Sequence, residues 1–83
     1  MNKTIVVIPT LNEYENVEIL LDKFLTLDVD VVFIDDNSID HTDQIIENNI
    51  YFDKKYFIIK REKKLGYASA VIDGINFGMN NRY

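Results

Sequence analysis

The chain is 83 residues long, carries a net charge of −5 at pH 7 and contains no cysteine. A chain of this length forms at most one small domain, residues 1–83, and without cysteine it has neither a disulfide framework nor a thiolate metal site. An acidic balance argues against nucleic acid as a partner, and no apolar run approaches the ~20 residues of a membrane span. We therefore expect a soluble, cytoplasmic protein.

The first strand is predicted at residues 4–8, an apolar and β-branched run that Pro9 should end, because proline cannot donate to a sheet ladder. A helix is predicted to follow as far as Leu27, with Thr10 or Asn12 as its N-cap. Its buried stripe is expected to consist of Val17, Leu20, Leu21, Phe24 and Leu27, which recur with helical spacing.

The later elements alternate in the same way. A second strand at residues 29–34 precedes a short helix at about 40–48, and a third strand at 56–60 precedes a helix at about 67–79. The aromatic residues around the third strand, expected in the core, are Tyr51, Phe52, Tyr56 and Phe57. The stripe expected to be buried on the last helix consists of Ala68, Val71, Ile72, Ile75 and Met79.

Alternating strands and helices predict an α/β fold with a parallel sheet. Right-handed crossovers put the strands in the order 3-2-1, with the first two helices on the same face. The expected architecture is therefore a three-layer, Rossmann-like βαβαβα arrangement.

The end of the second strand carries the most chemistry, because a buried apolar run leads directly into Asp35 and Asp36. In open parallel sheets, ligands bind outside the carboxyl ends of the strands. Neighbouring strand residues point to opposite faces, so we expect one carboxylate to receive the ligand and the other to hold the loop. Ser38 or Asp40 is expected to cap the following helix. The end of the third strand and the loop after it carry four basic residues, Lys60, Arg61, Lys63 and Lys64. Such residues attract a diphosphate, but a charge run in a loop is usually solvated, and we expect solvation here.

Three blocks in order, IPTLNEYENV, FIDDNSIDHT and KREKKLGYASAVIDGINFG, resemble the N-terminal part of a family 2 glycosyltransferase. The resemblance spans residues 5 to about 79 and is closest to the dolichyl-phosphate mannosyltransferase and polyprenyl-phosphate sugar transferase branch. It implies a truncated half of a GT-A nucleotide-sugar domain. Enzymes of this family transfer a sugar from a UDP or GDP donor to a polyprenyl or dolichyl phosphate or another acceptor, usually with Mg²⁺ or Mn²⁺.

The resemblance also implies nucleotide-binding residues. Pro9 and Glu13 match the family's first nucleotide-contacting loop, and Leu11 stands where an aromatic side chain commonly stacks on the base. Asp36 matches the carboxylate that accepts hydrogen bonds from the base, and Asp35 is the neighbouring family carboxylate. The residues that match the loop before the last helix are Lys64 and Gly66.

The metal-binding aspartate motif, the catalytic base and the acceptor site of the family are expected beyond residue 83. We therefore expect no catalytic residue, metal ligand or cofactor in this chain, and membrane contact only through a missing part or a lipid acceptor. The alternative is a non-catalytic remnant or binding module. Such a module would associate with itself, or with a complementary C-terminal fragment, through the open edge of the first strand.

Overall fold

The computed structural model describes residues 4–62 and 66–83. Its three strands are all parallel and lie in the order β1-β2-β3, so β2 is central and the predicted α/β fold and strand order are confirmed. The elements in chain order are β1 (Ile5–Thr10), α1 (Tyr14–Lys23), a 3₁₀ turn η1 (Phe24–Thr26), β2 (Asp30–Asp35), α2 (Thr42–Glu47), β3 (Tyr56–Lys60) and α3 (Tyr67–Asn80).

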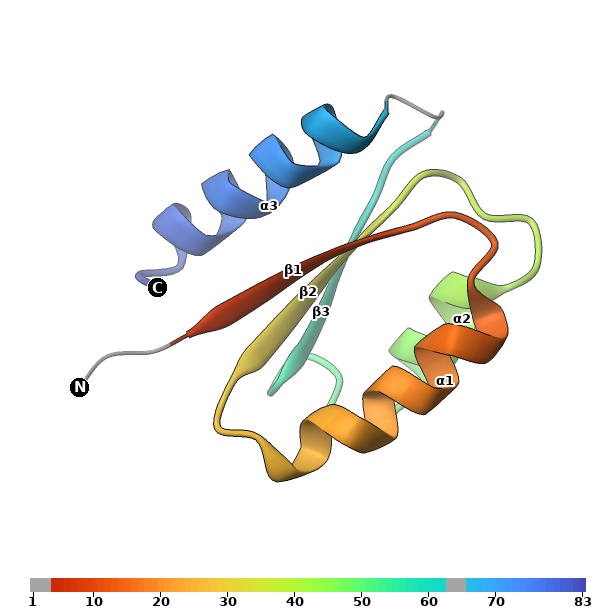
Figure 1. The fold of residues 1–83 in the computed structure, drawn as a ribbon, viewed down its shortest axis with the longest axis horizontal. Coiled ribbons are helices and arrows are strands. Elements are labelled where there is room, and N and C mark those ends of the chain that lie inside the picture. Colours follow the sequence, from red (N-terminus) through yellow and green to blue (C-terminus); the bar gives the residue numbers. More distant parts are fainter. Residues whose placement is uncertain (1–3, 63–65) are drawn as a thin grey trace.

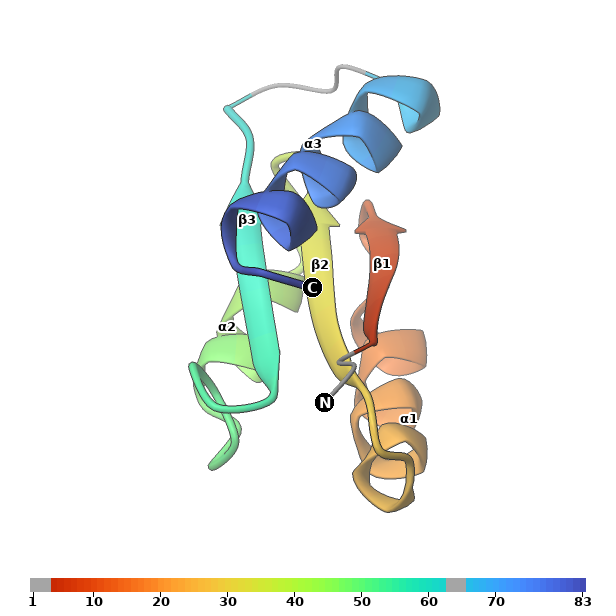
Figure 2. The same cartoon turned by 90° about the vertical axis from the view of Figure 1, so that its left-hand side faces the viewer.

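The elements form three layers. Helices α1 and α2 lie side by side on one face of the sheet, and α3 covers the other face (Figure 1). Figure 2, turned by 90°, shows the three strands from the α3 side, with α3 crossing them obliquely. The predicted layering is therefore confirmed. Among the described residues, no helix has the length and apolar character needed to cross a bilayer.

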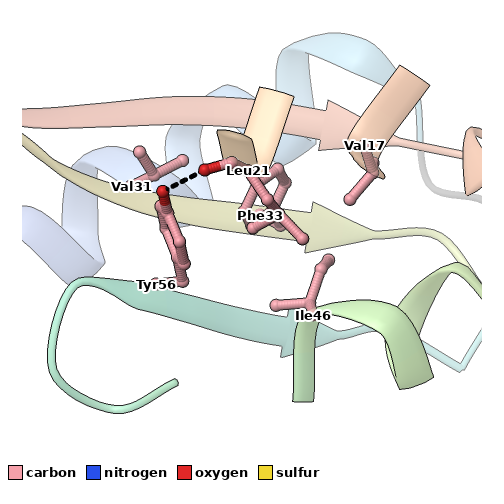
Figure 3. Close-up of a cluster of buried hydrophobic side chains, with 6 residues drawn as sticks. All are labelled: Val17, Leu21, Val31, Phe33, Ile46 and Tyr56. Atoms are coloured by element: carbon pink, nitrogen blue, oxygen red, sulfur yellow. Dashed lines mark hydrogen bonds between the residues drawn. The ribbon is translucent and has the colours of Figure 1, made fainter. Parts of the chain in front are cut away.

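The central strand is buried on both faces, as its continuous apolar run predicts. Val31 and Phe33 point toward α1 and α2, where they pack with Val17, Leu21, Ile46 and Tyr56 (Figure 3). The hydroxyl of Tyr56 donates a 2.5 Å hydrogen bond to the carbonyl of Leu21 within this cluster. Burial, followed by the nearby charge of Asp22, raises the pKa of Tyr56. On the opposite face, the residues beneath α3 include Val32, Ile34 and Ala70.

Only part of the predicted aromatic core is fully buried. Tyr56 is completely buried, whereas Phe52 and Phe57 are half-buried and Tyr51 is 40% exposed. The ring of Tyr51 nevertheless meets the ring of Tyr56 edge-on, with centroids 6.5 Å apart. Tyr51 therefore covers the outer side of the core, and its predicted place inside it is wrong.

The prediction that Pro9 ends the first strand is wrong, because β1 continues to Thr10 and Pro9 pairs in register with Ile34. The carbonyls of Thr4 and Thr10 accept hydrogen bonds from β2, from Asp30 and Asp36. Strand residues alternate in the side to which they bond, so Pro9 has its nitrogen on the opposite, unpaired side of β1. A proline is tolerated at such an edge because no ladder hydrogen bond is lost.

The buried face of α3 also differs from the predicted stripe. The residues against the sheet are Ala70, Gly74 and Gly78, whereas Ile72, Ile75 and Met79 are 57%, 51% and 71% exposed. The helix lies too close to β1 for larger side chains. A Cβ atom on Gly74 would stand 2.1 Å from Cγ1 of Val7 and one on Gly78 3.2 Å from Cγ2 of Ile5.

Two helix boundaries differ from the predictions for local reasons. Helix α1 ends at Lys23 instead of Leu27, because η1 tightens the last turn and the Leu27 amide donates to the Phe24 carbonyl at 3.2 Å. Leu27 is accordingly 51% exposed. Helix α2 begins at Thr42 because His41, with φ of 67°, has a left-handed backbone that cannot continue a helix.

Candidate functional site

The carboxyl ends of the three strands bring together several of the predicted site residues. Thr10 ends β1, Asp35 ends β2 with Asp36 directly after it, and Arg61 follows the last residue of β3. In this register Asp35 lies opposite both Thr10 and Lys60. All of these strand-end residues except Lys60 are buried. The edge is therefore a packed polar cluster.

Asp35 holds two segments together. The side chain of this residue, which is 2% exposed, accepts hydrogen bonds from the hydroxyls of Thr10 at 2.8 Å and Ser38 at 2.6 Å. Its second oxygen accepts the backbone amide of Ser38 at 3.0 Å. These contacts fit the loop-holding role predicted for one of the two adjacent carboxylates, while the implied nucleotide contact of Asp35 stays a prediction.

Asp36 forms an ion pair with Arg61, whose Nε atom lies 2.5 Å from Oδ1 of the carboxylate. Both residues are buried, at 8% and 7% exposure. The expectation that Arg61 is solvated is therefore wrong. Hydrogen bonding to Asp36, followed by that to Asp73, favours the charged guanidinium against its burial and raises the pKa of Arg61.

The same guanidinium also binds the start of α3. Its Nη1 donates to Ser69 at 2.8 Å and to Asp73 at 3.1 Å, and its Nη2 donates to the Gly66 carbonyl at 3.1 Å. Arg61 therefore joins the end of β2, the residue before α3 and the first two turns of α3. Gly66 has φ of 94°, a conformation that favours glycine because it has no Cβ.

Sequence reasoning missed the role of Arg61, although the pattern contains a signal for it. Asp35 pairs with Lys60 in the parallel ladder, so the next residues of the two strands, Asp36 and Arg61, leave the sheet side by side. A carboxylate and an arginine that directly follow neighbouring buried strands are placed to form an ion pair. By contrast, Lys60 is an exposed surface residue, and its hydrogen bond with Glu47, followed by that with Asp43, raises its pKa.

The loop before α1 and the loop before α2 are joined by reciprocal hydrogen bonds. The amide of Asn12 donates to the Ser38 hydroxyl at 2.8 Å, and the amide of Ile39 donates to the Asn12 side chain at 2.9 Å. Asn12 and Asn37 both have positive φ, which asparagine tolerates better than most residues. The hydrogen bonds thus make the conformation of each loop depend on that of the other.

Helix α1 is capped from the neighbouring loop. Its N-cap is Glu13, which makes no capping bond of its own, so the predicted caps Thr10 and Asn12 are wrong. The amide of Glu13 donates to the Thr42 hydroxyl at 3.1 Å, and the amide of Tyr14 donates to Asp40 at 3.2 Å. Asp40 also accepts the Thr42 amide at 3.1 Å, but the N-cap of α2 is His41, so the predicted cap at Ser38 or Asp40 is wrong.

The electrostatics of this capping cluster favour an ionised Asp40. The hydroxyl of Thr42 and the amides of Tyr14 and Thr42 all donate to its carboxylate. The hydrogen bond from the Thr42 hydroxyl is the largest effect and, with the amide bonds, lowers the pKa of Asp40. A negative charge at the start of α1 is also favoured by the helix dipole.

The remaining predicted residues are less tightly grouped. Pro9 and Glu13 line a groove of about 400 Å³ between β1 and α1, together with Ile8 and Leu20. Glu13 also borders a polar groove of about 790 Å³ between the first turns of α1 and α2. Leu11 is half-buried next to them. Lys64, like Lys63, lies outside the described residues.

The carboxylates of this edge do not fit a divalent metal site. Asp35 accepts three hydrogen bonds from Thr10 and Ser38, and Asp36 is paired with a buried guanidinium. A cation there would compete with Arg61 for the same carboxylate oxygen. Across residues 4–62 and 66–83, no group of three His, Cys, Asp or Glu side chains is arranged to hold a metal ion.

One comparison with known proteins identifies a family for this chain. The family model described as glycosyl transferase family 2 matches residues 5–79. The chain is 37% identical over 84 residues to the uncharacterized protein MJ0544 of Methanocaldococcus jannaschii. That alignment covers 95% of this chain but 35% of the relative, so the chain spans about a third of the relative's length. No solved structure matches.

Proposed function

Because the chain belongs to glycosyl transferase family 2, we propose that it binds the nucleotide part of a sugar donor at the carboxyl edge of its sheet. The observation that carries this proposal is the convergence of Asp35, Asp36 and Gly66 at that edge. Each of these residues forms a contact with a residue of a neighbouring segment. Ligands of open α/β sheets bind in this region of the fold.

In the proposed complex, the carboxylate of Asp36 accepts a hydrogen bond from a ring N–H of the base. An ionised carboxylate accepts hydrogen bonds only, and both uracil and guanine present ring N–H donors. Arg61 fixes the position of this carboxylate, and Asp35 fixes the loop that follows it. In this proposal Asp36 contacts the ligand, and Asp35 supports the loop that follows.

Leu11 should make binding weak. It occupies the position where the family resemblance implies an aromatic residue, and an aliphatic side chain lacks the π-face that stacks on a base. We expect a dissociation constant in the millimolar range, or about −4 kcal/mol.

The donor we propose is a UDP- or GDP-sugar, and the transfer we propose for the complete enzyme is to a dolichyl or polyprenyl phosphate. The resemblance of the three sequence blocks to that branch supports this acceptor. The Mg²⁺ or Mn²⁺ of the complete enzyme would be held by residues other than the carboxylates of this edge, which are engaged in structural contacts.

Calorimetric titration with UDP and with GDP tests the proposal. The Asp36→Asn variant keeps the shape of the side chain and should weaken binding at least about tenfold, or 1.4 kcal/mol. The matched control is Asp53→Asn, in an exposed turn before β3, where a residue with φ of 64° tolerates asparagine. The control should bind like the wild type. Equal affinity of Asp36→Asn and wild type, or no binding by the wild type at millimolar nucleotide, would overturn the proposal.

A second candidate function is a non-catalytic binding module that associates through the open edge of β1. The exposed apolar side chains of α3 favour it. Nucleotide binding by a monomer would argue for the donor-binding function, whereas association without nucleotide binding would argue for the module.

A further inference from the structure

Ser38 links the two loops that carry the proposed nucleotide contacts. Its hydroxyl donates to Oδ1 of Asp35 at 2.6 Å and accepts the backbone amide of Asn12 at 2.8 Å. A hydroxyl has a single hydrogen to donate, and an ionised carboxylate can only accept. The bond to Asp35 therefore uses that hydrogen and leaves the lone pairs of the hydroxyl for the Asn12 amide.

The hydroxyl of Ser38 does not serve to start a helix. Helix α2 begins at Thr42 and has His41 as its N-cap, so Ser38 lies outside its first turn. Within the described part of the chain, the hydroxyl bonds Asp35 at the end of β2 and Asn12 in the loop before α1. It therefore joins two segments of the carboxyl edge to each other.

Leu11 lies between two residues that are held by this network. On one side, the Thr10 hydroxyl donates at 2.8 Å to Oδ1 of Asp35, the same oxygen that accepts from Ser38. On the other side is Asn12, whose amide is bound by the Ser38 hydroxyl. The position of Leu11 is therefore set by contacts with the loop that follows β2.

Asp36 lies within the same network. It directly follows Asp35, and its amide donates to the Thr10 carbonyl at 3.1 Å. Ser38, further along the loop, donates its backbone amide to Oδ2 of Asp35 at 3.0 Å. The network thus holds the chain on both sides of Asp36 as well as on both sides of Leu11.

We propose that Ser38 is a positioning residue of the nucleotide site, because its hydroxyl sets the separation between Leu11 and Asp36. This role rests on the proposed function, in which Asp36 binds the edge of the base and Leu11 lies against its face. Holding both residues in place before the ligand binds lowers the entropic cost of ordering two loops. The network is formed entirely by residues 10–39, so Ser38 acts in this way without any further segment or partner.

Nucleotide titration of Ser38 variants tests the proposal in a chain with increased affinity. Leu11→Tyr supplies an aromatic face and should tighten UDP or GDP binding about tenfold by stacking on the base. Ser38→Ala should cancel this gain, because the side chain at position 11 is no longer held over the base. Ser38→Thr keeps a hydroxyl and should preserve the gain. The matched control is Thr26→Ala, which removes an exposed hydroxyl from η1 and should leave the affinity unchanged.

Amide hydrogen exchange of the free chain gives a second readout that needs no ligand. Ser38→Ala should accelerate exchange of the Asn12 amide at least about tenfold, because its acceptor is lost. The Leu27 amide, which is bonded within η1, should exchange as in the wild type. If circular dichroism shows that Ser38→Ala is unfolded, Asn12→Gly replaces it in the titration. Glycine tolerates the φ of 53° at this position and removes only the oxygen that accepts the Ile39 amide.

The results that would overturn the proposal can be told apart. If neither the wild type nor Leu11→Tyr binds nucleotide, the proposed function is wrong and this role of Ser38 with it. If nucleotide binds but Ser38→Ala, or Asn12→Gly in its place, leaves the affinity undiminished, the role of Ser38 alone is wrong. The same holds if Ser38→Thr weakens binding as much as Ser38→Ala, or if the Asn12 amide exchanges at an unchanged rate.

Discussion

The guanidinium of Arg61 contacts the end of β2, the residue before α3 and two side chains of α3. The Asp36 carboxylate that it neutralises is also buried. A buried ion pair contributes little net stability compared with apolar residues, but the loss of one partner leaves an uncompensated charge. Removing Arg61 should therefore lower the stability of the chain more than removing any surface charge.

Arg61→Met should lower the free energy of unfolding by about 3–5 kcal/mol, because it removes the guanidinium that neutralises the buried Asp36 carboxylate. In a domain this small, complete loss of the cooperative unfolding transition would indicate the same destabilisation at a larger magnitude. Urea denaturation measures the effect. The control is Arg82→Met at an exposed position, expected to change stability by less than about 0.5 kcal/mol. Adding Asp36→Asn to Arg61→Met should restore part of the loss, and a double variant less stable than Arg61→Met would contradict the pairing.

Asp40 should make the junction between the two loops sensitive to acid. Its pKa is lowered in the folded chain, chiefly by the Thr42 hydroxyl, so its contribution to stability is present above the ordinary value of 3.8. That contribution is lost as the pH falls through the lower, folded pKa. Hydrogen exchange of the Tyr14 amide should accelerate over that range. Asp40→Asn should remove the acid-dependent step, and the exposed control Asp22→Asn should keep it.

At the level of residues, the sequence pointed to Asp35 and Asp36 correctly as the polar end of a buried strand. It did not reveal their partners, because a side chain's partner depends on strand register and on how a loop returns. Arg61 is the clearest case, since a charged segment favours a solvated side chain unless its strand neighbours are known.

Helix α3 depends on its small residues for its closeness to β1. Gly74→Ala adds a methyl group that would stand 2.1 Å from Cγ1 of Val7, a stiff side chain with little room to move. The variant should be destabilised by about 1–3 kcal/mol, although alanine favours a helix more than glycine does. Thermal or urea unfolding measures this.

Gly78→Ala is the control within the same helix, because its methyl group would stand 3.2 Å from Ile5 and should cost less. Shortening the opposing side chain with Val7→Ala should make Gly74→Ala less harmful. If Gly74→Ala stabilised the wild-type chain, the close approach of α3 to β1 would be incorrect.

The end of α3 is held by Tyr83. Its amide donates to the Gly78 carbonyl at 2.9 Å, and its hydroxyl donates to Asp30 at the start of β2. Arg82 has φ of 65°, so the helix ends in a Schellman motif. The last residue of the chain therefore ties α3 to the sheet at the end opposite to Arg61.

Alkaline titration should reveal this tether, because burial, followed by the hydrogen bond with Asp30, raises the pKa of Tyr83 to about 12. The neutral form is favoured in the folded chain. Its contribution is complete below the ordinary value of 10.0 and is lost as the pH rises through about 12. Tyr83→Phe should remove one tyrosinate absorbance step at high pH. Removal of the same late step by Tyr67→Phe, at a side chain that is 74% exposed, would contradict the assignment.

Among the elements, β3 was predicted with its observed bounds because its apolar run is short and ends in charged residues. The buried stripe of α3 could not be predicted in the same way. Hydrophobic periodicity identifies the most apolar side of a helix, but close packing on a strand selects the smallest side chains. The large apolar residues of α3 were consequently assigned to the wrong side.

At the scale of the whole molecule, the proposed donor site and the close contact between α3 and β1 are separate. The proposed site lies at the carboxyl ends of the strands, whereas α3 contacts β1 along residues 5–7. Strand order and layering followed from the alternation of elements, because right-handed crossovers leave few arrangements. The position of α3 on the sheet did not, since it depends on how closely the small residues of α3 approach β1.

Nucleotide binding at the carboxyl edge is tested most directly by an NMR titration of the ¹⁵N-labelled chain with UDP and GDP. The amides expected to shift, in saturable fashion at millimolar nucleotide, are those of Leu11, Glu13, Asp36 and Gly66. The amides of residues 52–55, at the opposite end of the sheet, should remain unchanged. Shifts confined to that opposite end, or no shifts at saturating nucleotide, would contradict a donor site at this edge.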